Sequence, residues 1–562
     1  MRRLTVPAVI AGCVAALVFA LLPPAQQHTE APPATTIRGA FHVHSTRSDG
    51  GGSVDDIAAA AARAGLQFVI ITDHGDAMRT PDAPAYRSGV LVIDGVEVST
   101  SGGHYAVAGL PASPYPLAGA PSEVIEDVQR MGGLGIAAHP GSPRTSLAWR
   151  DWDAPIDGLE WINSDSEWRD EPSLPLARAL ITYLFRAPES IGALLDRDAS
   201  MMQRWDELAS RRRVVGIAGA DAHARLGFRQ RTDPDISALH VPLPGYEPSF
   251  ATFSNHVELD APLSGTPSAD AERLLSAMRR GRLYTVVDAF ATPGAIAFTA
   301  TSGSSVANMG EGVHATADVL LHATATAPPG TTLVLLRNGQ RIHEVTDAPL
   351  DTNGGRDRAA YRVEAYLRGV PGVPWMVSNP IYVDIDRAPA GEADASVTSR
   401  IPARTSEAAT EFGAHDASRI DVGDPQNVRA RTFAGDPAIN WSFSLGPGTA
   451  AGQFAAIPIP VSPGLDTFAR VRFTVSSSQP MRAWVQLRES SGNTDRWGAS
   501  FYADSEPRIV DLPFARFRPL GVTSSPQPPL ARVAFLLFVV DTLNTLPGTS
   551  GRLTLSDIGF VK

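Results

Sequence analysis

The sequence predicts an α/β domain followed by two all-β domains. Within residues 37–289, short apolar runs alternate with amphipathic stretches of helical period, a pattern typical of a parallel sheet or barrel. From residue 290 onward, short β-rich runs alternate with Gly, Pro and Asn turns, as in β-sandwiches. A polar, Ser-rich linker at 389–410 is expected to separate a sandwich at 290–388 from a jelly-roll-like domain at 411–562.

The N-terminus carries the pattern of an export segment. Two arginines follow Met1, and an apolar run extends from Leu4 to Leu22. Residues 1–25 therefore predict a signal peptide or, because the run approaches the length of a membrane span, an uncleaved anchor. Lipidation at Cys13 is a third alternative, and a Pro-rich linker follows at 26–36. The protein is expected to be secreted, periplasmic or anchored on the outer side of the cytoplasmic membrane.

The α/β domain shows separate helix and strand signals. Ser53–Ala64, Ser122–Met131 and Ala271–Arg280 have amphipathic helical patterns, and Ser53 is placed as an N-cap. Trp168–Arg213 is expected to be a helical insertion, with its clearest helix at Met201–Arg211. The expected strands are FVIITDH, LVIDGVEV, GLGIAAHP and VVGIAGADAH. GLGIAAHP and VVGIAGADAH each end in polar residues, and in α/β folds functional side chains sit where strands end.

Composition excludes several kinds of chemistry. Cys13 is the only cysteine and Lys562 the only lysine among 562 residues. An internal disulfide, a thiolate metal cluster, a phosphate-binding loop lysine and Schiff-base catalysis are therefore excluded. The net charge of −11 argues against a protein that coats nucleic acid.

Histidines and carboxylates recur at the strand ends. His42 and His44 form an H-x-H pair, and alternation along a strand places both imidazoles on one face. The other candidates are Asp49, His74, Glu97, His104, His139, Asp221 and His223. Nine nitrogen and oxygen ligands exceed what one ion uses, so they predict two or three divalent ions, namely Zn, Mn or Fe.

The ordered motifs resemble the PHP (polymerase and histidinol phosphatase) metallohydrolases. They read H-x-H, S-D-G, T-D-H, G-x-E, A-H-P and D-A-H over about residues 37–290. EVSTSGGHYAVAGL, DGLEWIN and SNPIYV resemble more narrowly the carbaryl-hydrolase-like branch, which carries a sandwich after the PHP domain. The resemblance implies a distorted (β/α)7 barrel with up to three metals at its mouth. It also implies phosphoesterase activity, although the branch includes a carbamate hydrolase.

The resemblance also implies a distribution of ligands. The first metal would be held by His42, His44, Glu97 and Asp221. The second would be held by Asp49, His74 and His223, and the third by His104, His139 and a bridging Glu97. Asp49 stands where some family members have His, and its harder oxygen favours Mn or Fe over Zn.

Further residues near these motifs are given supporting roles. Asp73 is expected either to orient the neighbouring imidazole of His74 or to cap a helix. Glu160 and Asn163 are expected to line the pocket or to support a ligand. The arginines after the D-A-H turn either grip a phosphate or form a solvated basic loop; they are Arg225, Arg229 and Arg231.

The sequence favours an exported hydrolase of small phosphate esters, with Asp73, His74, Glu97 and Asp221 in catalytic roles. Two alternatives stay open: an ester, amide or carbamate hydrolase with the same metals, and a non-catalytic carbohydrate-binding surface protein. For the C-terminal domain, Trp441, Trp484 and Trp497 either form a sugar-stacking surface for a cell-surface glycan or pack in the core. No obligate protein partner is indicated.

Overall fold

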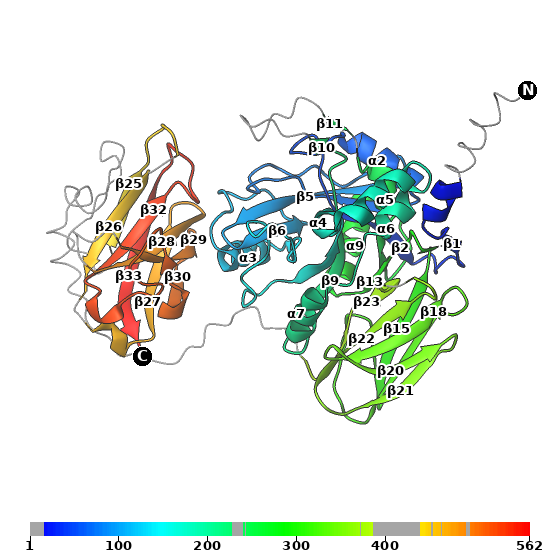
Figure 1. The fold of residues 1–562 in the computed structure, drawn as a ribbon. Coiled ribbons are helices and arrows are strands. Elements are labelled where there is room, and N and C mark those ends of the chain that lie inside the picture. Colours follow the sequence, from blue (N-terminus) through cyan, green and yellow to red (C-terminus); the bar gives the residue numbers. More distant parts are fainter. Residues whose placement is uncertain are drawn as a thin grey trace, which may run out of the picture. The chain divides into compact units, whose positions relative to one another are not determined.

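The computed structural model describes residues 16–227, 240–241, 243–370, 372–385, 439–450, 453–461, 464–489 and 495–562 (Figure 1). These residues form two compact units. The first comprises residues 1–76, 80–111 and 128–388, and the second comprises 77–79, 112–127 and 389–562. Most of the predicted export segment, Arg229, Arg231 and the linker at 389–410 lie outside the described residues.

A closed barrel of seven strands forms the centre of the first unit. Its strands are β2 (Thr36–Val43), β3 (Phe68–Ile71), β5 (Val90–Thr100), β6 (Gly103–Ala108), β7 (Leu134–Ala137), β8 (Gly158–Asn163) and β9 (Val215–Ala222). Pairing of Phe41 with Gly219 and of Val43 with Ala222 closes it. β6 runs antiparallel to β5 and β7, whereas the other neighbours are parallel.

Helices come between some of these strands in the chain, and α8 and α9 follow the last of them. They are α2 (Val54–Arg63), α3 (Pro121–Arg130), α4 (Ser164–Asp170), α5 (Ser173–Tyr183), α6 (Ala187–Gly192), α7 (Ala199–Ala209), α8 (Tyr246–Phe250) and α9 (Pro267–Arg279). Ser53 caps α2 in a reciprocal capping box with Asp56, as its sequence indicates. β5 and β6 form a hairpin, and in the chain β4 (Ala85–Arg87) comes between β3 and β5. Strands and helices therefore do not alternate regularly.

Two apolar layers hold the barrel and α2 together. Alternate residues of β2 point to opposite faces, so Phe41 lies in a core with Phe68 and Ile93, while Ala40 packs in a second cluster with Ile57 of α2. All five side chains are almost completely buried. Burial of a large apolar side chain contributes about 1.5–3 kcal/mol, so these layers fix the strand ends that carry polar side chains.

The barrel sheet continues into a β-sandwich. β12 (Ser254–Glu258) pairs with β2 and with β13 (Leu283–Val286), and β13 pairs with β23 (Met376–Ser378). This sheet also contains β17 (Gly312–Val313), β19 (Thr332–Arg337), β20 (Gln340–Thr346), β22 (Ala359–Tyr366) and β24 (Ile381–Val383). The four strands that form the second sheet, green in Figure 1, are β15 (Ala295–Ser302), β16 (Ser305–Asn308), β18 (Val319–Thr326) and β21 (Leu350–Gly355). Two small pairings join β1 (Gln27–His28) to β14 (Ala291–Thr292) and β10 (Leu226–Gly227) to β11 (His240–Val241).

Buried polar groups tie these sheets to neighbouring elements. Arg362 of β22 is buried and donates two hydrogen bonds of 2.9 and 3.0 Å from Nη2 to the carboxylate of Asp206 on α7. His256 of β12 is fully buried, and neither ring nitrogen has a hydrogen-bond partner. Burial, together with the nearby charge of Arg38, lowers the pKa of His256 to about 3.

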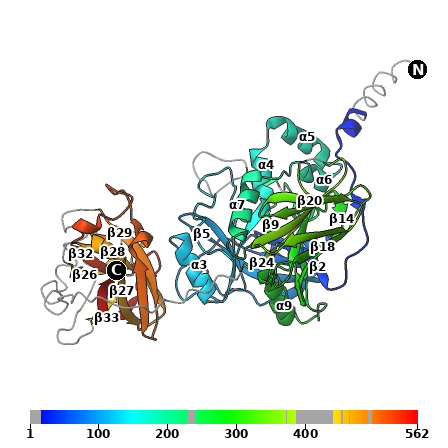
Figure 2. The same ribbon diagram turned by 90° about the horizontal axis from the view of Figure 1, so that it is seen from below.

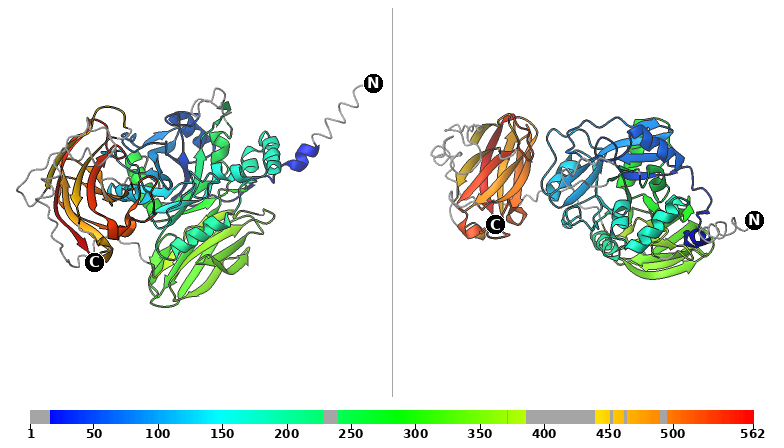
Figure 3. Two further views of the ribbon diagram at one scale, coloured as in Figure 1. Left: turned by 60° about the vertical axis from the view of Figure 1, so that its left-hand side comes forward. Right: turned by 45° about the horizontal axis from the view of Figure 1, so that its top comes forward.

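The second unit contains two antiparallel sheets (Figure 3). One consists of β25 (Ile439–Ser444), β27 (Arg470–Ser477), β30 (Arg508–Pro513) and β33 (Ser550–Val561); the other consists of β26 (Phe454–Pro460), β28 (Met481–Arg488), β29 (Trp497–Ala503), β31 (Arg518–Pro519) and β32 (Phe535–Asp541). Trp441 and Trp497 belong to the main core and Trp484 to a smaller buried cluster. The tryptophans therefore pack inside, as in the second of their two predicted roles. No helix among the described residues is long and apolar enough to cross a membrane.

Candidate metal centre

All nine predicted ligands come together at one end of the barrel. Each belongs to at least one of four groups of His, Asp and Glu whose donor atoms lie within 4.8 Å of one another. The groups are His42, His44 and Glu97; His42, His139 and Asp221; His74, Glu97 and His104; and His44, Asp49, His74 and His223. The groups share residues, so they form one continuous cluster of ligands rather than separate sites.

The deepest part of the cluster brings two imidazoles and two carboxylates together. Glu97 Oε2 lies 3.3 Å from His42 Nε2 and 3.3 Å from His44 Nε2. Asp221 Oδ1 lies 3.4 Å from each of the same two nitrogens. Ligands about 2.0–2.1 Å from one ion at tetrahedral angles are about 3.3–3.4 Å apart, and these nitrogen–oxygen distances agree with that spacing.

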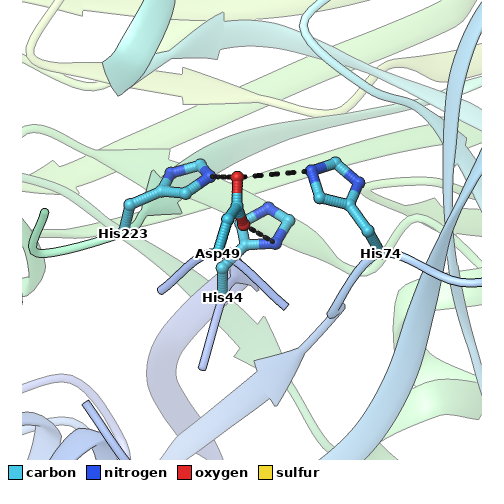
Figure 4. A group of neighbouring side chains, drawn as sticks. All are labelled: His44, Asp49, His74 and His223. Atoms are coloured by element: carbon cyan, nitrogen blue, oxygen red, sulfur yellow. Dashed lines mark ion pairs between the residues drawn. The ribbon is translucent and has the colours of Figure 1, made fainter. Parts of the chain in front are cut away.

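The second part of the cluster lies nearer to solvent (Figure 4). Asp49 Oδ2 lies 3.2 Å from His223 Nε2 and 3.7 Å from His74 Nε2. The other oxygen, Oδ1, lies 3.5 Å from His44 Nδ1. In Figure 4 the carboxylate of Asp49 lies between the rings of His223 and His74. One carboxylate and two imidazoles thus face a shared position, with half of the Asp49 side chain exposed.

Glu97 joins the deep pair of histidines to a further pair. Its Oε1 lies 2.8 Å from His104 Nδ1 and 3.0 Å from His139 Nε2, on the side away from the first two histidines. The two oxygens of one carboxylate therefore face different sets of imidazoles. Such an arrangement lets one side chain bridge two adjacent ions.

The backbone is strained at three of the nine residues. His42, His139 and Asp221 have φ values of 66°, 30° and 43°, in the left-handed region. Such conformations cost about 1–3 kcal/mol for a residue other than glycine, and they concentrate at functional sites. With these conformations, side chains from β2, β9 and the loop after β7 point toward the same cluster.

The carboxylates and several imidazoles of the cluster shift one another's pKa. Burial by itself would raise the pKa of Glu97, but His42 and the hydrogen bond with His104 hold it well below its usual range. Burial opposes the charged form of His42, yet its carboxylate neighbours, chiefly Asp221, raise its pKa well above the ordinary value. Burial has the same effect on His223, and the contact with Asp49 raises its pKa to about 9. Burial lowers the pKa of His44. Divalent cations would compete with protons for these ring nitrogens.

Unpaired ring nitrogens provide a separate test of metal fit. His42 Nε2, His44 Nε2 and His139 Nδ1 are buried and have no hydrogen-bond partner. A buried nitrogen without a partner costs about 1–3 kcal/mol, and coordination to a metal removes that cost. The nitrogens of His42 and His44 without a partner are the two that lie 3.3–3.4 Å from Glu97 Oε2 and Asp221 Oδ1, so this donor set fits a divalent ion.

Glu160 and Asn163 support the cluster from behind. Glu160 Oε1 lies 2.6 Å from His42 Nδ1, and its Oε2 accepts hydrogen bonds from the backbone N–H of His139 and from Asn163 Nδ2. Both side chains are buried. A Cβ on Gly219 would lie 2.2 Å from the Glu160 carboxyl group, so glycine leaves the room that this carboxylate needs. These contacts favour the second of the two predicted roles, support of a ligand.

Asp73 caps no helix in the described chain, and its carboxylate bonds to the loop that follows β2. Its carboxylate accepts hydrogen bonds from the backbone N–H and hydroxyl of Ser45 and from the hydroxyl of Ser48. Successive residues of an extended chain point in opposite directions, so Asp73 points away from the imidazole of His74. No helix begins directly after it in the described chain. Asp73 instead fixes the loop between His44 and Asp49.

Tyr246 was not singled out by the sequence, although it holds the same loop. Its hydroxyl donates to the carbonyl of His44 at 2.7 Å and accepts from the N–H of Gly52 at 3.1 Å. It lies on α8, far away in sequence, and a single tyrosine in a helix gives no signal of such a contact. Of the predicted phosphate-gripping arginines, Arg225 is partly buried just after the His223 turn, and the other two lie outside the described residues.

Comparison with known proteins gives distant likenesses. No known protein-family profile matches the chain. It is 34% identical over 108 residues to the uncharacterized protein MJ1587 of Methanocaldococcus jannaschii; this stretch is 18% of the chain and spans 62% of the archaeal protein.

Solved structures of two kinds are among those with a likeness to this chain. One is a two-domain protein of Bacteroides vulgatus containing a predicted PHP-like metal-dependent phosphoesterase, with 14% identity over 63% of this chain and 99% of that one, at a TM-score of 0.28. The other is the family 11 carbohydrate-binding module of a Clostridium thermocellum cellulase, with 17% identity over 24% of this chain and 81% of that one, at a TM-score of 0.20. At these TM-scores the functional conclusion rests on the side-chain geometry.

Proposed function

We propose that this protein is a PHP-type metal-dependent hydrolase that cleaves phosphate esters at a centre of two or three divalent ions. The observation that carries the proposal is the position of Glu97. Its two oxygens lie 2.8–3.3 Å from imidazole nitrogens on opposite sides of the carboxylate. Ions that share such a bridge lie close enough to act on one substrate.

The side chains of this chain divide the work. His42, His44, Glu97 and Asp221 would hold the first ion. Asp49, His74 and His223 would hold the second, and His104 and His139 with Glu97 the third. His74 Nδ1 also lies 3.1 Å from Glu97 Oε2, so the ligand sets adjoin one another. Ions bound here supply water activation near neutral pH and neutralise charge that develops on the phosphoryl oxygens. Glu160 fixes which nitrogen of His42 faces the centre, and Asp73 fixes the loop that carries Asp49.

Oxygen and nitrogen ligands, without a cysteine in the cluster, are compatible with Mn, Fe and Zn. The same centre is also chemically suited to carboxyl and carbamate esters, which is why substrate class needs a direct comparison. The three tryptophans that suggested a glycan-binding role for the C-terminal domain are buried. They therefore give that role no support, and it stays a prediction.

The test compares substrate classes on one preparation. Metal-free protein is loaded in turn with Mn²⁺, Fe²⁺ or Zn²⁺ and assayed with an aryl phosphomonoester, a phosphodiester, a carboxylester and a carbamate. Glu97→Gln, purified in parallel, controls for contaminating hydrolases. We expect metal-dependent hydrolysis of a phosphate ester that is absent from the variant. Hydrolysis of only the carboxylester or carbamate would replace phosphate esters as the substrate class, and no turnover of any ester would refute the proposal.

A further inference from the structure

An apolar surface lies on the helical insertion that follows β8. Leu174, Leu180 and Ile181 of α5, with Leu184 and Phe185 directly after it, are all exposed; Leu174 is 81% and Leu184 82% exposed. We call these five residues the α5 apolar face. Isolated exposed leucines are ordinary, but a group of five large apolar side chains on one short segment indicates a binding surface.

Helical geometry places these side chains on one side of α5. At 100° per residue, the three exposed residues of the helix fall within about a third of its circumference. Thr182, on the side of the helix toward the protein, is buried. Leu176, Ala179 and Tyr183 of the helix are partly buried, so α5 carries apolar side chains on its outward side as well as toward the protein.

The chain's own apolar N-terminal segment ends at this surface. Arg178 of α5 donates from Nε to the carbonyl of Leu21 at 2.8 Å, and Arg186 donates to the carbonyl of Pro23. Residues 16–21 are helical, and Leu17 and Phe19 among them are exposed. Figure 2 shows α5 at the end of the first unit where this N-terminal helix, in blue, leaves it. The end of the apolar run, at Leu21 and Pro23, is thus held by two residues of this helical segment, Arg178 and Arg186.

We propose that the α5 apolar face lies in the surface of a phospholipid bilayer, next to the point where the N-terminal apolar segment meets the same membrane. Exposed leucine and phenylalanine side chains enter the boundary between headgroups and acyl chains. The two arginines at the edge of the face suit anionic headgroups, because their stems pack on apolar groups while their charges stay near water. The inference is independent of the proposed hydrolase activity.

Site-specific fluorescence tests the proposal on the full chain. Cys13→Ser removes the only native thiol, and Leu184→Cys or Leu174→Cys then receives an environment-sensitive fluorophore. Val306→Cys is the matched control, because Val306 is an exposed apolar residue, at 63%, on β16 of the sandwich. Each protein is incorporated into phosphatidylcholine–phosphatidylglycerol vesicles with or without a doxyl-labelled phosphatidylcholine that quenches within the bilayer. Flotation isolates the vesicle-bound fraction.

We expect doxyl lipid to quench the labels at 184 and 174 severalfold and to leave the label at 306 unchanged. Placing Leu184→Glu and Phe185→Glu in the protein labelled at 174 should remove most of that quenching, while metal content stays unchanged. Labels at 184 and 174 that remain open to aqueous iodide in vesicle-bound protein would overturn the proposal, as would a full chain that does not float with vesicles. Shielding of the labels without lipid that grows with protein concentration would assign the face to a second copy of the chain.

Discussion

Replacing the bridging carboxylate should cost the protein more than one metal ion. Glu97→Gln keeps the size of a side chain that is only 1% exposed, but an amide offers a single weak carbonyl ligand in place of two anionic oxygens. Asp49→Asn makes the same chemical change at a carboxylate that faces the second ion alone. The comparison therefore isolates the effect of bridging.

The magnitude follows from the number of ions that each carboxylate touches. Binding free energies of about 10–16 kcal/mol for four-ligand zinc sites give about 2.5–4 kcal/mol for each ligand. At 1.4 kcal/mol for each factor of ten, losing one ligand weakens the binding of an ion by about 60-fold to 700-fold. Glu97→Gln should produce this weakening at two ions and abolish hydrolysis. Asp49→Asn should produce it at one, and excess metal should restore part of its activity.

The assay is elemental analysis after dialysis against graded chelator concentrations, with turnover measured on the same samples. Asp55→Asn on the exposed surface of α2 is the control, and it should retain wild-type metal content. Circular dichroism confirms folding of each variant. Full metal occupancy in Glu97→Gln, or a larger loss in Asp49→Asn than in Glu97→Gln, would refute the bridging role.

Three further changes test the surroundings of the centre. Glu160→Gln weakens the acceptor for His42 Nδ1, and chelator titration should show about 10–100-fold weaker metal binding; unchanged affinity would contradict a positioning role. Arg362→Met leaves the buried Asp206 carboxylate unpaired, so urea denaturation should show a loss of about 3–5 kcal/mol, and a loss below 1 kcal/mol would show that the pair is dispensable. His256 stays neutral in the folded protein down to about pH 3, while the unfolded chain takes up its proton near 6.5, so its contribution is full above pH 6.5 and is lost as the pH falls toward 3. Lowering the pH from 7 to 5 should therefore reduce the unfolding free energy of the wild type by about 2 kcal/mol more than that of His256→Phe. Equal reductions in urea titrations would contradict a buried, neutral His256.

The composition of the centre was predictable because strand ends are encoded locally. An apolar run followed by T-D-H or D-A-H marks both a buried strand and the polar residues that leave it. Closure of a barrel then brings such ends together whatever the lengths of the connections. The nine residues met in the structure for this reason, although the hairpin of β5 and β6 breaks the regular alternation of strand and helix.

The supporting contacts were less predictable because they depend on which way a side chain points. Asp73 and His74 are adjacent, yet one holds the Ser45–Ser48 loop and the other faces Asp49. Tyr246 reaches the carbonyl of His44 from α8, across 202 residues of chain. Periodicity identified the helical insertion in the same way, but it could not show that the apolar side of α5 faces outward.

The backbone at the centre departs from local preference in a manner that links fold to chemistry. His42 and Asp221 occupy left-handed conformations on β2 and β9, the two strands whose pairing closes the barrel. Residues with bulky side chains ordinarily avoid left-handed conformations. At His42, the pairing of the neighbouring Phe41 with Gly219 holds the strand beside this conformation. The register shift between Phe41 and Val43 accommodates the turn at His42, so closure of the barrel and the aim of its imidazole depend on the same local distortion. A change that removed the strain without moving the strands should therefore turn the ring away from Glu97 and Asp221, and we expect such a change to raise stability and lower metal affinity.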